Sequence, residues 1–230
     1  MLTDADRKRI EQAVRQAETR TSGEIYCVVA SESSDYREVP LAWAGAAALV
    51  APAILLAGGV HVTAPELMGD GWTAAQMAAA AEQAARGALG GAILLQGALF
   101  IAVALFTAIP PIRRFVTPRM LKQDRVRRRA RELFMSKNLA ATRERTGVLI
   151  YISVAEHMAE LVADDGISEK VEPVVWEGAM ARLVAGFKLK RPVEGFEQAI
   201  DQCAEILSEH FPARPGDNPN ELPDAVVVLS

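Results

Sequence analysis

The sequence has 230 residues, half of them hydrophobic, and a formal net charge of -4 at pH 7. This balance argues against a general nucleic-acid binder, because neutralising phosphates requires a net basic surface or a concentrated basic face. The only two cysteines, Cys27 and Cys203, have no paired spacing and no histidine cluster near them, so neither a disulfide framework nor a zinc site is indicated. The length allows one ordinary domain and an additional segment, and the excess apolar residues lie in two blocks.

The first piece of the chain predicts a helix followed by a strand. Residues 3–20 have the apolar spacing of an amphipathic helix, with Thr3 as the capping residue, and Thr-Ser-Gly at 21–23 ends it. Residues 24–30 are rich in strand formers. A single short strand is not stable alone, so its partners are expected elsewhere in the chain.

Two uncharged apolar blocks follow, at about 41–62 and 89–109. At about 1.5 Å per residue, each spans roughly 30 Å of hydrocarbon. Pro52 lies inside the first block, where neighbouring groups in a membrane can satisfy the carbonyl that a proline leaves free. Gln96, the polar residue of the second block, is expected to contact a partner helix. The alternative for each block is a buried helix of a soluble core, but the lengths favour two membrane-spanning helices.

The distribution of basic residues predicts the orientation of this hairpin. Nine lysines and arginines lie between Arg113 and Arg131, opposed only by Asp124, whereas the connector at 63–88 has only Arg86. Positive residues flanking membrane helices stay in the cytoplasm, so we expect an external connector, with a short helix after the Gly-Asp-Gly turn at 69–71, and two cytoplasmic termini. Whether the basic run also binds anionic lipid head groups stays open. The predicted division is 1–38, first helix and strand; 39–112, hairpin; 113–211, remainder of the domain; and 212–230, tail.

The segment after the hairpin repeats the order of the first piece. A helix is expected at 118–140 and a strand at 146–154, so the two strands are predicted to be parallel neighbours. A turn at 156–158 leads to a third strand at 160–163, which pairs with the second as an antiparallel hairpin.

The C-terminal part predicts two helices that cover a small sheet. Ser168 caps the first, which runs toward Phe187, and the second follows Pro192. The proline-rich tail at 212–223 is expected to be irregular, and residues 225–229 fit an edge strand.

A sequence pattern in this segment resembles the TPM domain family. It consists of Arg-Thr-Gly-Val-Leu-Ile-Tyr-Ile-Ser-Val-Ala at 145–155, then 159–171 and Trp176, and the resemblance covers about 144–212. It implies a small three-layer α/β sandwich, here similar to a bacterial membrane subgroup in which a two-helix transmembrane hairpin follows the first strand. Many members have Asp-Arg in the turn where this chain has Glu156-His157. Some members have phosphatase activity or bind calcium, but a fold does not by itself determine a function.

One group of residues could bind a cation. The predicted sheet brings Glu24, Arg145, Asp164 and Asp165 to one edge. Carboxylates of Glu24, Asp164 and Asp165 would suit calcium or magnesium, and the bound ion could engage phosphate. The same residues also fit ordinary structural roles: a turn at 164–166, a surface ion pair of Glu24 with Arg145, and a helix start.

No other catalytic arrangement is indicated by the sequence. Its serines lack a nearby His-Asp pairing, and it has no phosphate-binding loop or dinucleotide fingerprint. We therefore expect a non-enzymatic interaction module of the bacterial inner membrane, which contacts the bilayer and assists assembly or maintenance of membrane or envelope proteins. The alternative is a low-efficiency, metal-dependent phosphatase or a cation-binding domain.

Overall fold

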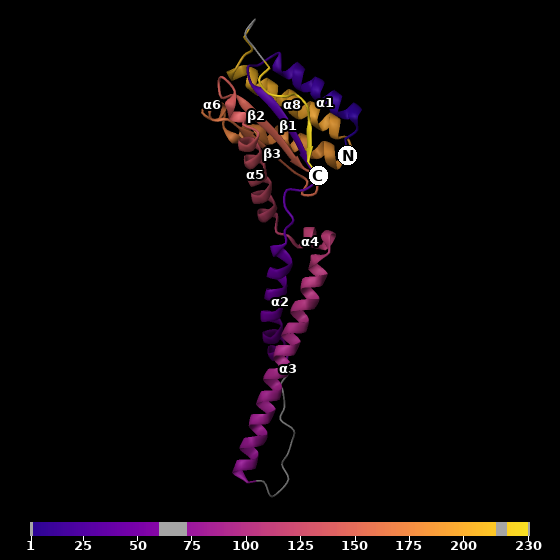
Figure 1. The fold of residues 1–230 in the computed structure, drawn as a ribbon, viewed down its shortest axis with the longest axis vertical. Helices are drawn as coiled ribbons and strands as arrows, with labels where there is room; N and C mark the ends of the chain where they lie inside the picture. Colours follow the sequence, from indigo (N-terminus) through magenta and orange to yellow (C-terminus); the bar gives the residue numbers. More distant parts are fainter. Residues whose placement is uncertain (1, 60–72, 215–219, 230) are drawn as a thin grey trace. The chain divides into compact units, whose positions relative to one another are not determined.

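The computed structural model describes residues 2–59, 73–214 and 220–229 of the chain. It forms two compact units, an α/β unit of Met1–Asp35 and Pro118–Ser230 and a helical unit of Tyr36–Thr117 (Figure 1). The α/β unit is thus assembled from two pieces of sequence with the helical unit inserted between them.

The first helix and strand lie where the sequence predicts them. α1 is Asp4–Glu18, and Thr3 caps it: the Thr3 hydroxyl accepts from the Asp6 N–H at 3.2 Å while the Asp6 carboxylate accepts from the Thr3 N–H at 2.8 Å. β1 is Glu24–Ala30. All seven of its residues are buried, as in a strand covered on both faces.

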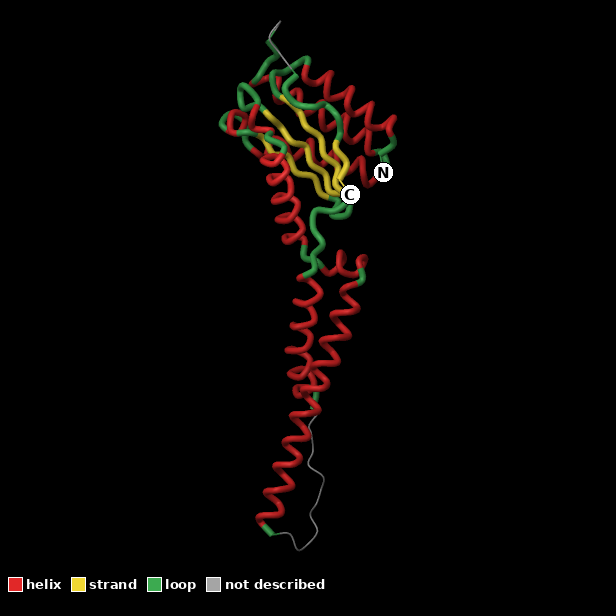
Figure 2. Tube along the Cα trace, viewed as in Figure 1, coloured by secondary structure: helices red, strands yellow, loops and turns green. Residues whose placement is uncertain are grey.

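The sheet has four strands in the order β3-β2-β1-β4. Its strands are drawn in yellow in Figure 2. β2, Gly147–Ser153, is parallel to β1, and β3, Met158–Ala163, is antiparallel to β2, so both pairing predictions are confirmed. The short β4, Val227–Leu229, lies parallel to β1 on its other side. β1 is therefore an inner strand, and β3 and β4 are the edges.

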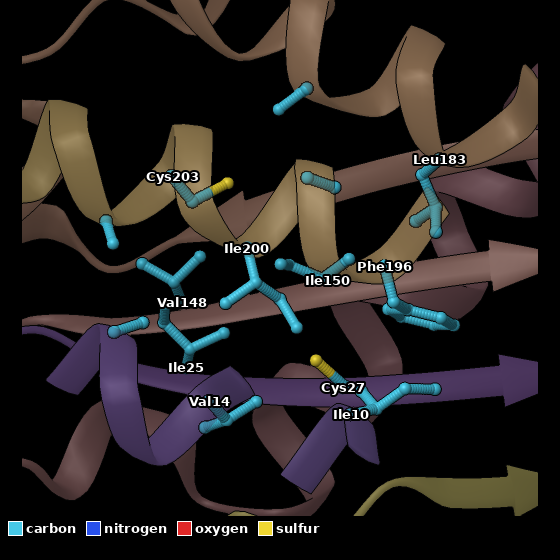
Figure 3. Packing of buried hydrophobic residues seen from close by; sticks show 14 of the residues in the cluster. Ile10, Val14, Ile25, Cys27, Val148, Ile150, Leu183, Phe196, Ile200 and Cys203 are labelled. Atoms are coloured by element: carbon cyan, nitrogen blue, oxygen red, sulfur yellow. The ribbon is translucent and has the colours of Figure 1, made fainter. Parts of the chain in front are cut away.

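Helices cover both faces of the sheet. On one face, α5, Arg119–Ser136, buries Val126, Ala130, Leu133 and Phe134 against β1 and β2. On the other face lie α1, α7, Glu177–Lys188, and α8, Pro192–His210. Figure 3 shows the core between these helices and the sheet, which contains Ile10, Val14, Ile25, Cys27, Val148, Ile150, Leu183, Phe196, Ile200 and Cys203. This mixed α/β architecture agrees with the predicted fold class.

The helix predicted from Ser168 to Phe187 is wrong. The structure has instead a short helix α6, Asp165–Ser168, a 3-10 turn at Pro173–Trp176, and then α7. Asp164, not Ser168, is the capping residue, and its side chain accepts from the Asp165 N–H at 2.6 Å. Pro173 cannot donate a helical hydrogen bond, so it interrupts the segment despite the apolar spacing around it.

The helical unit is a hairpin whose two long helices are joined by a hydrogen bond from a side chain to a backbone carbonyl. α2 is Glu38–Ala57, α3 is Ala74–Ala108, and a short helix α4, Pro110–Val116, follows. Pro52 has no N–H for the carbonyl of Ala48, four residues before it, and the Gln96 Nε2 of α3 donates to this carbonyl at 3.2 Å. The predicted partner helix of Gln96 is thus α2.

The second helix differs from the prediction because the short connector helix and the second apolar block form one helix of 35 residues. No proline interrupts Ala74–Ala108, and its alanine-rich first half favours a helix. Both α2 and α3 are long and apolar enough to span a membrane, by length and composition. The expected turn at 69–71 and the last residues of the first block, 60–62, lie outside the described residues.

Candidate functional site

The predicted cation-binding residues lie at one end of the sheet, where β1 and β2 begin and β3 ends, and backbone pairing places them there. Glu24 pairs with Gly147 across β1 and β2, and the Gly147 carbonyl accepts from the Asp164 N–H at 3.0 Å. Gly147 cannot be replaced without movement, since a Cβ at this position would lie 2.2 Å from the Leu139 carbonyl oxygen. The three backbone positions are therefore neighbours.

The Glu24 side chain binds the C-terminal tail. Its Oε2 accepts from the N–H groups of Glu221 and Leu222 at 3.2 and 3.0 Å, and only 4% of the residue is exposed. Burial raises the pKa of Glu24 above its ordinary value, against the two N–H donors that lower it. This carboxylate holds the tail on the sheet.

Asp164 and Asp165 share one arginine. The Arg145 Nη2 donates to Asp164 Oδ1 at 3.2 Å and to Asp165 Oδ2 at 2.7 Å. The two negative charges raise the pKa of Arg145. Asp164 is 3% exposed, and its Oδ2 is buried with no hydrogen-bond partner among the described residues. Arg145, predicted as an ion-pair partner of Glu24, forms ion pairs with these two aspartates instead.

These carboxylates do not converge on one point. Within residues 2–59, 73–214 and 220–229, no group of three or more His, Cys, Asp or Glu side chains is placed to hold a metal ion. A cation at Asp164 and Asp165 would compete with the Arg145 guanidinium. The calcium or magnesium site therefore stays a prediction.

A second carboxyl cluster, which the sequence did not indicate, lies beside Glu24. Glu18 at the end of α1 accepts from the Ile25 N–H at 2.9 Å and is hydrogen-bonded to Asp224 of the tail. The Arg15 Nε donates to Asp224 at 2.7 Å. Burial raises the pKa of Glu18 to about 8, and the nearby carboxylates add to this effect. With Thr19, Ala213, Arg214 and Asn220, these groups line a cavity of about 640 Å³.

At the opposite end of the sheet, where β1 and β2 end, a network of hydrogen bonds fixes the loop after β1. The Ser33 hydroxyl bonds to the Tyr151 hydroxyl at 2.9 Å, and the Ser33 N–H donates to the Glu156 carboxylate at 3.3 Å. Ser153 also donates to Glu156. His157 follows at a positive φ of 53° and is exposed. In the turn that departs from the family pattern, Glu156 thus has a structural role.

A groove of about 640 Å³ runs beside the edge strand β3, between α5 and α7. One wall is polar and basic and comes from α5, and the other is apolar and comes from α7. The lining residues are Arg119, Met120, Gln123, Asp124, Val126, Arg127, His157, Met158, Ala159, Glu160, Met180, Ala181, Val184, Ala185 and Lys188. This groove has no local signal in the sequence, because its two walls lie more than 50 residues apart in the chain.

Comparisons with known proteins agree with this architecture. Residues 112–206 match the family described as the TPM domain. The fold is similar to the NMR structure of BA42 protein from the psychrophilic bacteria Bizionia argentinensis sp. nov., with a TM-score of 0.54 and 18% sequence identity over 99% of this chain and 95% of that chain. At this identity the likeness concerns the fold alone. A comparison with curated proteins found no match. The chain therefore carries a match to the TPM domain over residues 112–206, within an α/β fold that it shares with the BA42 protein.

Proposed function

We propose that this chain is a TPM-type interaction module anchored in the bacterial inner membrane, which assists assembly or maintenance of membrane or envelope proteins. In this proposal α2 and α3 anchor the chain and the α/β unit recognises a protein partner. Both termini lie in the cytoplasm, and the connector between α2 and α3 lies outside.

The surface of the helical hairpin supports the anchor. Large apolar side chains on both helices are exposed, among them Leu49 at 76%, Leu94 at 76% and Leu105 at 68%. In water such a surface would be unfavourable, whereas in hydrocarbon these side chains match their surroundings. The basic run at 113–131 against the single Arg86 supports the orientation.

The single observation that carries the interaction role is the groove beside β3. It combines an apolar wall, a basic wall and the free edge of a sheet. In contrast, the polar clusters at both ends of the strands hold parts of the chain together: Glu24 binds the tail, Arg145 binds two aspartates, and Glu156 binds the loop after β1. A surface open to a partner therefore fits a binding role better than a catalytic one.

Photo-crosslinking in intact cells tests this role. A benzoylphenylalanine placed at Ala185 or Gln123, both exposed in the groove, should form a discrete crosslink to a protein partner. The same group at Lys8, which is exposed on α1, is the matched control. Crosslinks that are absent at both groove positions, or equally strong at Lys8, would contradict the proposal.

The alternative is a divalent-cation-dependent phosphatase. The buried Asp164 Oδ2 without a partner in the described chain favours it, since such an oxygen can ligate calcium or magnesium. In that reading, Glu24, Asp164 and Asp165 bind the ion. Calorimetric titration of the full chain in detergent with calcium should then show binding that Asp164→Asn/Asp165→Asn abolishes. No binding at millimolar calcium would rule the site out.

A further inference from the structure

We propose that β3 is the receptor strand for an extended segment of another protein, which adds to the sheet at its free edge and alternates acidic with small apolar residues. This inference rests on the interaction role and specifies its partner. It follows from the backbone direction of β3, the basic wall of α5 and the apolar wall of α7.

The backbone of β3 presents unpaired groups to the groove. The Asp164 N–H donates to Gly147 of β2, and groups facing a partner strand alternate along an antiparallel ladder. Met158, Glu160 and Val162 therefore face β2 with their N–H and C=O groups. Ala159 and Leu161 direct theirs to the free edge, where they have no hydrogen-bond partner in the described part of the chain. The Ala163 carbonyl is occupied, because the Ser168 hydroxyl donates to it at 3.3 Å. The open stretch is thus Ala159–Leu161.

The side of the groove formed by α5 favours negative charge. α5 carries seven lysines and arginines against two acidic residues. Of its charged residues, Arg119, Arg127 and Asp124 line the groove, and Asp124 pairs with Arg128 at 3.4 Å, so this side keeps a positive balance. Arg119 lines the groove and has no ion-pair partner within the described residues, whereas Arg127 pairs with Glu160 of β3 at 3.0 Å. A strand beside β3 would direct every second side chain toward this wall. Glutamate or aspartate at these positions would meet Arg119 and compete with Glu160 for Arg127.

The side formed by α7 favours small apolar groups. Met180, Ala181, Val184 and Ala185 line it, and Lys188 stands at its end. The alternate side chains of an added strand would point to this wall, where valine or alanine would bury apolar surface. Strand addition combines backbone hydrogen bonds, which give affinity, with alternating side-chain contacts, which give specificity.

A second copy of this chain fits the edge poorly. If two β3 strands paired about a two-fold axis normal to the sheet, their α5 helices would lie next to each other on the same face. Each α5 has an excess of five positive charges, so the two would repel. The positive charge of α5 therefore favours a negatively charged partner over a second copy of the chain.

The direct test is binding of a synthetic peptide to the full chain in mild non-ionic detergent. The probe is a fluorescein-labelled, acetylated heptapeptide, Val-Glu-Val-Glu-Val-Glu-Val, followed by fluorescence anisotropy. We expect saturable binding that weakens as salt is added, because the acidic side chains face Arg119 and Arg127. A peptide with lysine in place of glutamate should not bind. Equal binding of both peptides would overturn the inference.

Two variants and a matched control localise the binding. Ala159→Pro removes an N–H that does not bond to β2, so the variant should fold and bind at least tenfold more weakly. Arg127→Glu should weaken binding by a similar factor. Arg131→Glu makes the same charge change at an exposed position of α5 outside the groove, and its affinity should be unchanged. An unchanged affinity in Ala159→Pro would overturn strand addition.

Backbone methylation and hydrogen exchange test the geometry without altering the protein. One peptide is N-methylated at its valines and another at its glutamates, and only one set of amides can face β3. Exactly one of the two should bind, and exchange of the Ala159 and Leu161 amides should slow when the unmethylated peptide is bound. Two methylated peptides that behave alike would contradict the inference. If groove crosslinks form in cells but the peptide does not bind, the interaction role stands and the proposed partner chemistry is wrong.

Discussion

At the residue scale, the least expected feature is a pair of buried carboxyl groups that are hydrogen-bonded to each other. Glu18 and Asp224 are 8% and 7% exposed, and Glu24 lies next to them. Two buried carboxylates repel unless one keeps its proton, and burial favours the neutral form. The raised pKa of Glu18 follows from this arrangement, with Arg15 compensating the charge on Asp224.

The protonated Glu18 predicts a pH-dependent stability. Its pKa is about 8 in the folded chain against 4.5 ordinarily, so between these pH values the folded state binds more protons than the unfolded state. The stability from this group is therefore complete below about pH 4.5 and falls as pH rises toward 8, by at most about 1.4 kcal/mol per pH unit. Glu18→Gln keeps an acceptor for Ile25 and a donor for Asp224, so its melting temperature should fall less over this window.

Thermal unfolding of the full chain in detergent measures this effect. The buried Trp176 reports on the α/β unit when Trp43 and Trp72 are replaced by phenylalanine. Glu205→Gln on the exposed face of α8 makes the same charge change and is the control. Identical pH slopes for the parent and Glu18→Gln would show that Glu18 is ionised in the folded chain.

At the element scale, the parts that local sequence determines were predictable. The Thr3 cap and the strand-forming run before Ala30 gave α1 and β1, and the repeated helix-strand order gave the parallel pair. The helix predicted from Ser168 to Phe187 is not continuous, because Pro173 lacks the N–H for a helical hydrogen bond and the apolar spacing around it does not compensate. The site shows the same division. The predicted strand pairing places Glu24 and Asp164 at the same end of the sheet. The hydrogen bond of Glu18 to Asp224 joins residues about 200 positions apart, so no local sequence pattern indicates it.

If the Gln96–Ala48 hydrogen bond replaces the N–H that Pro52 lacks, its contribution to stability should depend on Pro52. Gln96→Leu should destabilise the hairpin by about 0.5–2 kcal/mol, because the Ala48 carbonyl loses its donor in an apolar setting. In a Pro52→Ala background, residue 52 supplies an N–H to that carbonyl, so the same Gln96→Leu change should cost almost nothing.

Hairpin opening by SDS can be followed by energy transfer from Trp43 to a dansyl label at Phe115→Cys. Both positions belong to the helical unit, and the Trp43 indole donates to the neighbouring Val116 carbonyl at 3.2 Å. The four chains of the double-mutant cycle give the coupling between positions 52 and 96. An equal cost of Gln96→Leu in both backgrounds would show that the glutamine does not compensate for the proline.

At the scale of the whole molecule, the chain leaves its α/β unit after β1 and returns to it at α5. The two pieces share one sheet and one core, since β1 pairs with β2 along its full length. If α2 and α3 cross the bilayer, an even number of crossings returns the chain to its starting side. In that case the pairing of β1 with β2 requires an even number of crossings between them, because a single crossing would separate the two strands.

The sidedness of three introduced cysteines tests this account most directly. The parent chain has only two buried cysteines, so it gives a low background. Lys8→Cys on α1, Glu205→Cys on α8 and Gln83→Cys on α3 are exposed to reagent. In intact bacterial cells an impermeant maleimide should label Gln83→Cys at once, and should label Lys8→Cys and Glu205→Cys only after permeabilisation. Labelling of Lys8→Cys and Glu205→Cys on opposite sides of the membrane would contradict a single domain divided by a membrane hairpin.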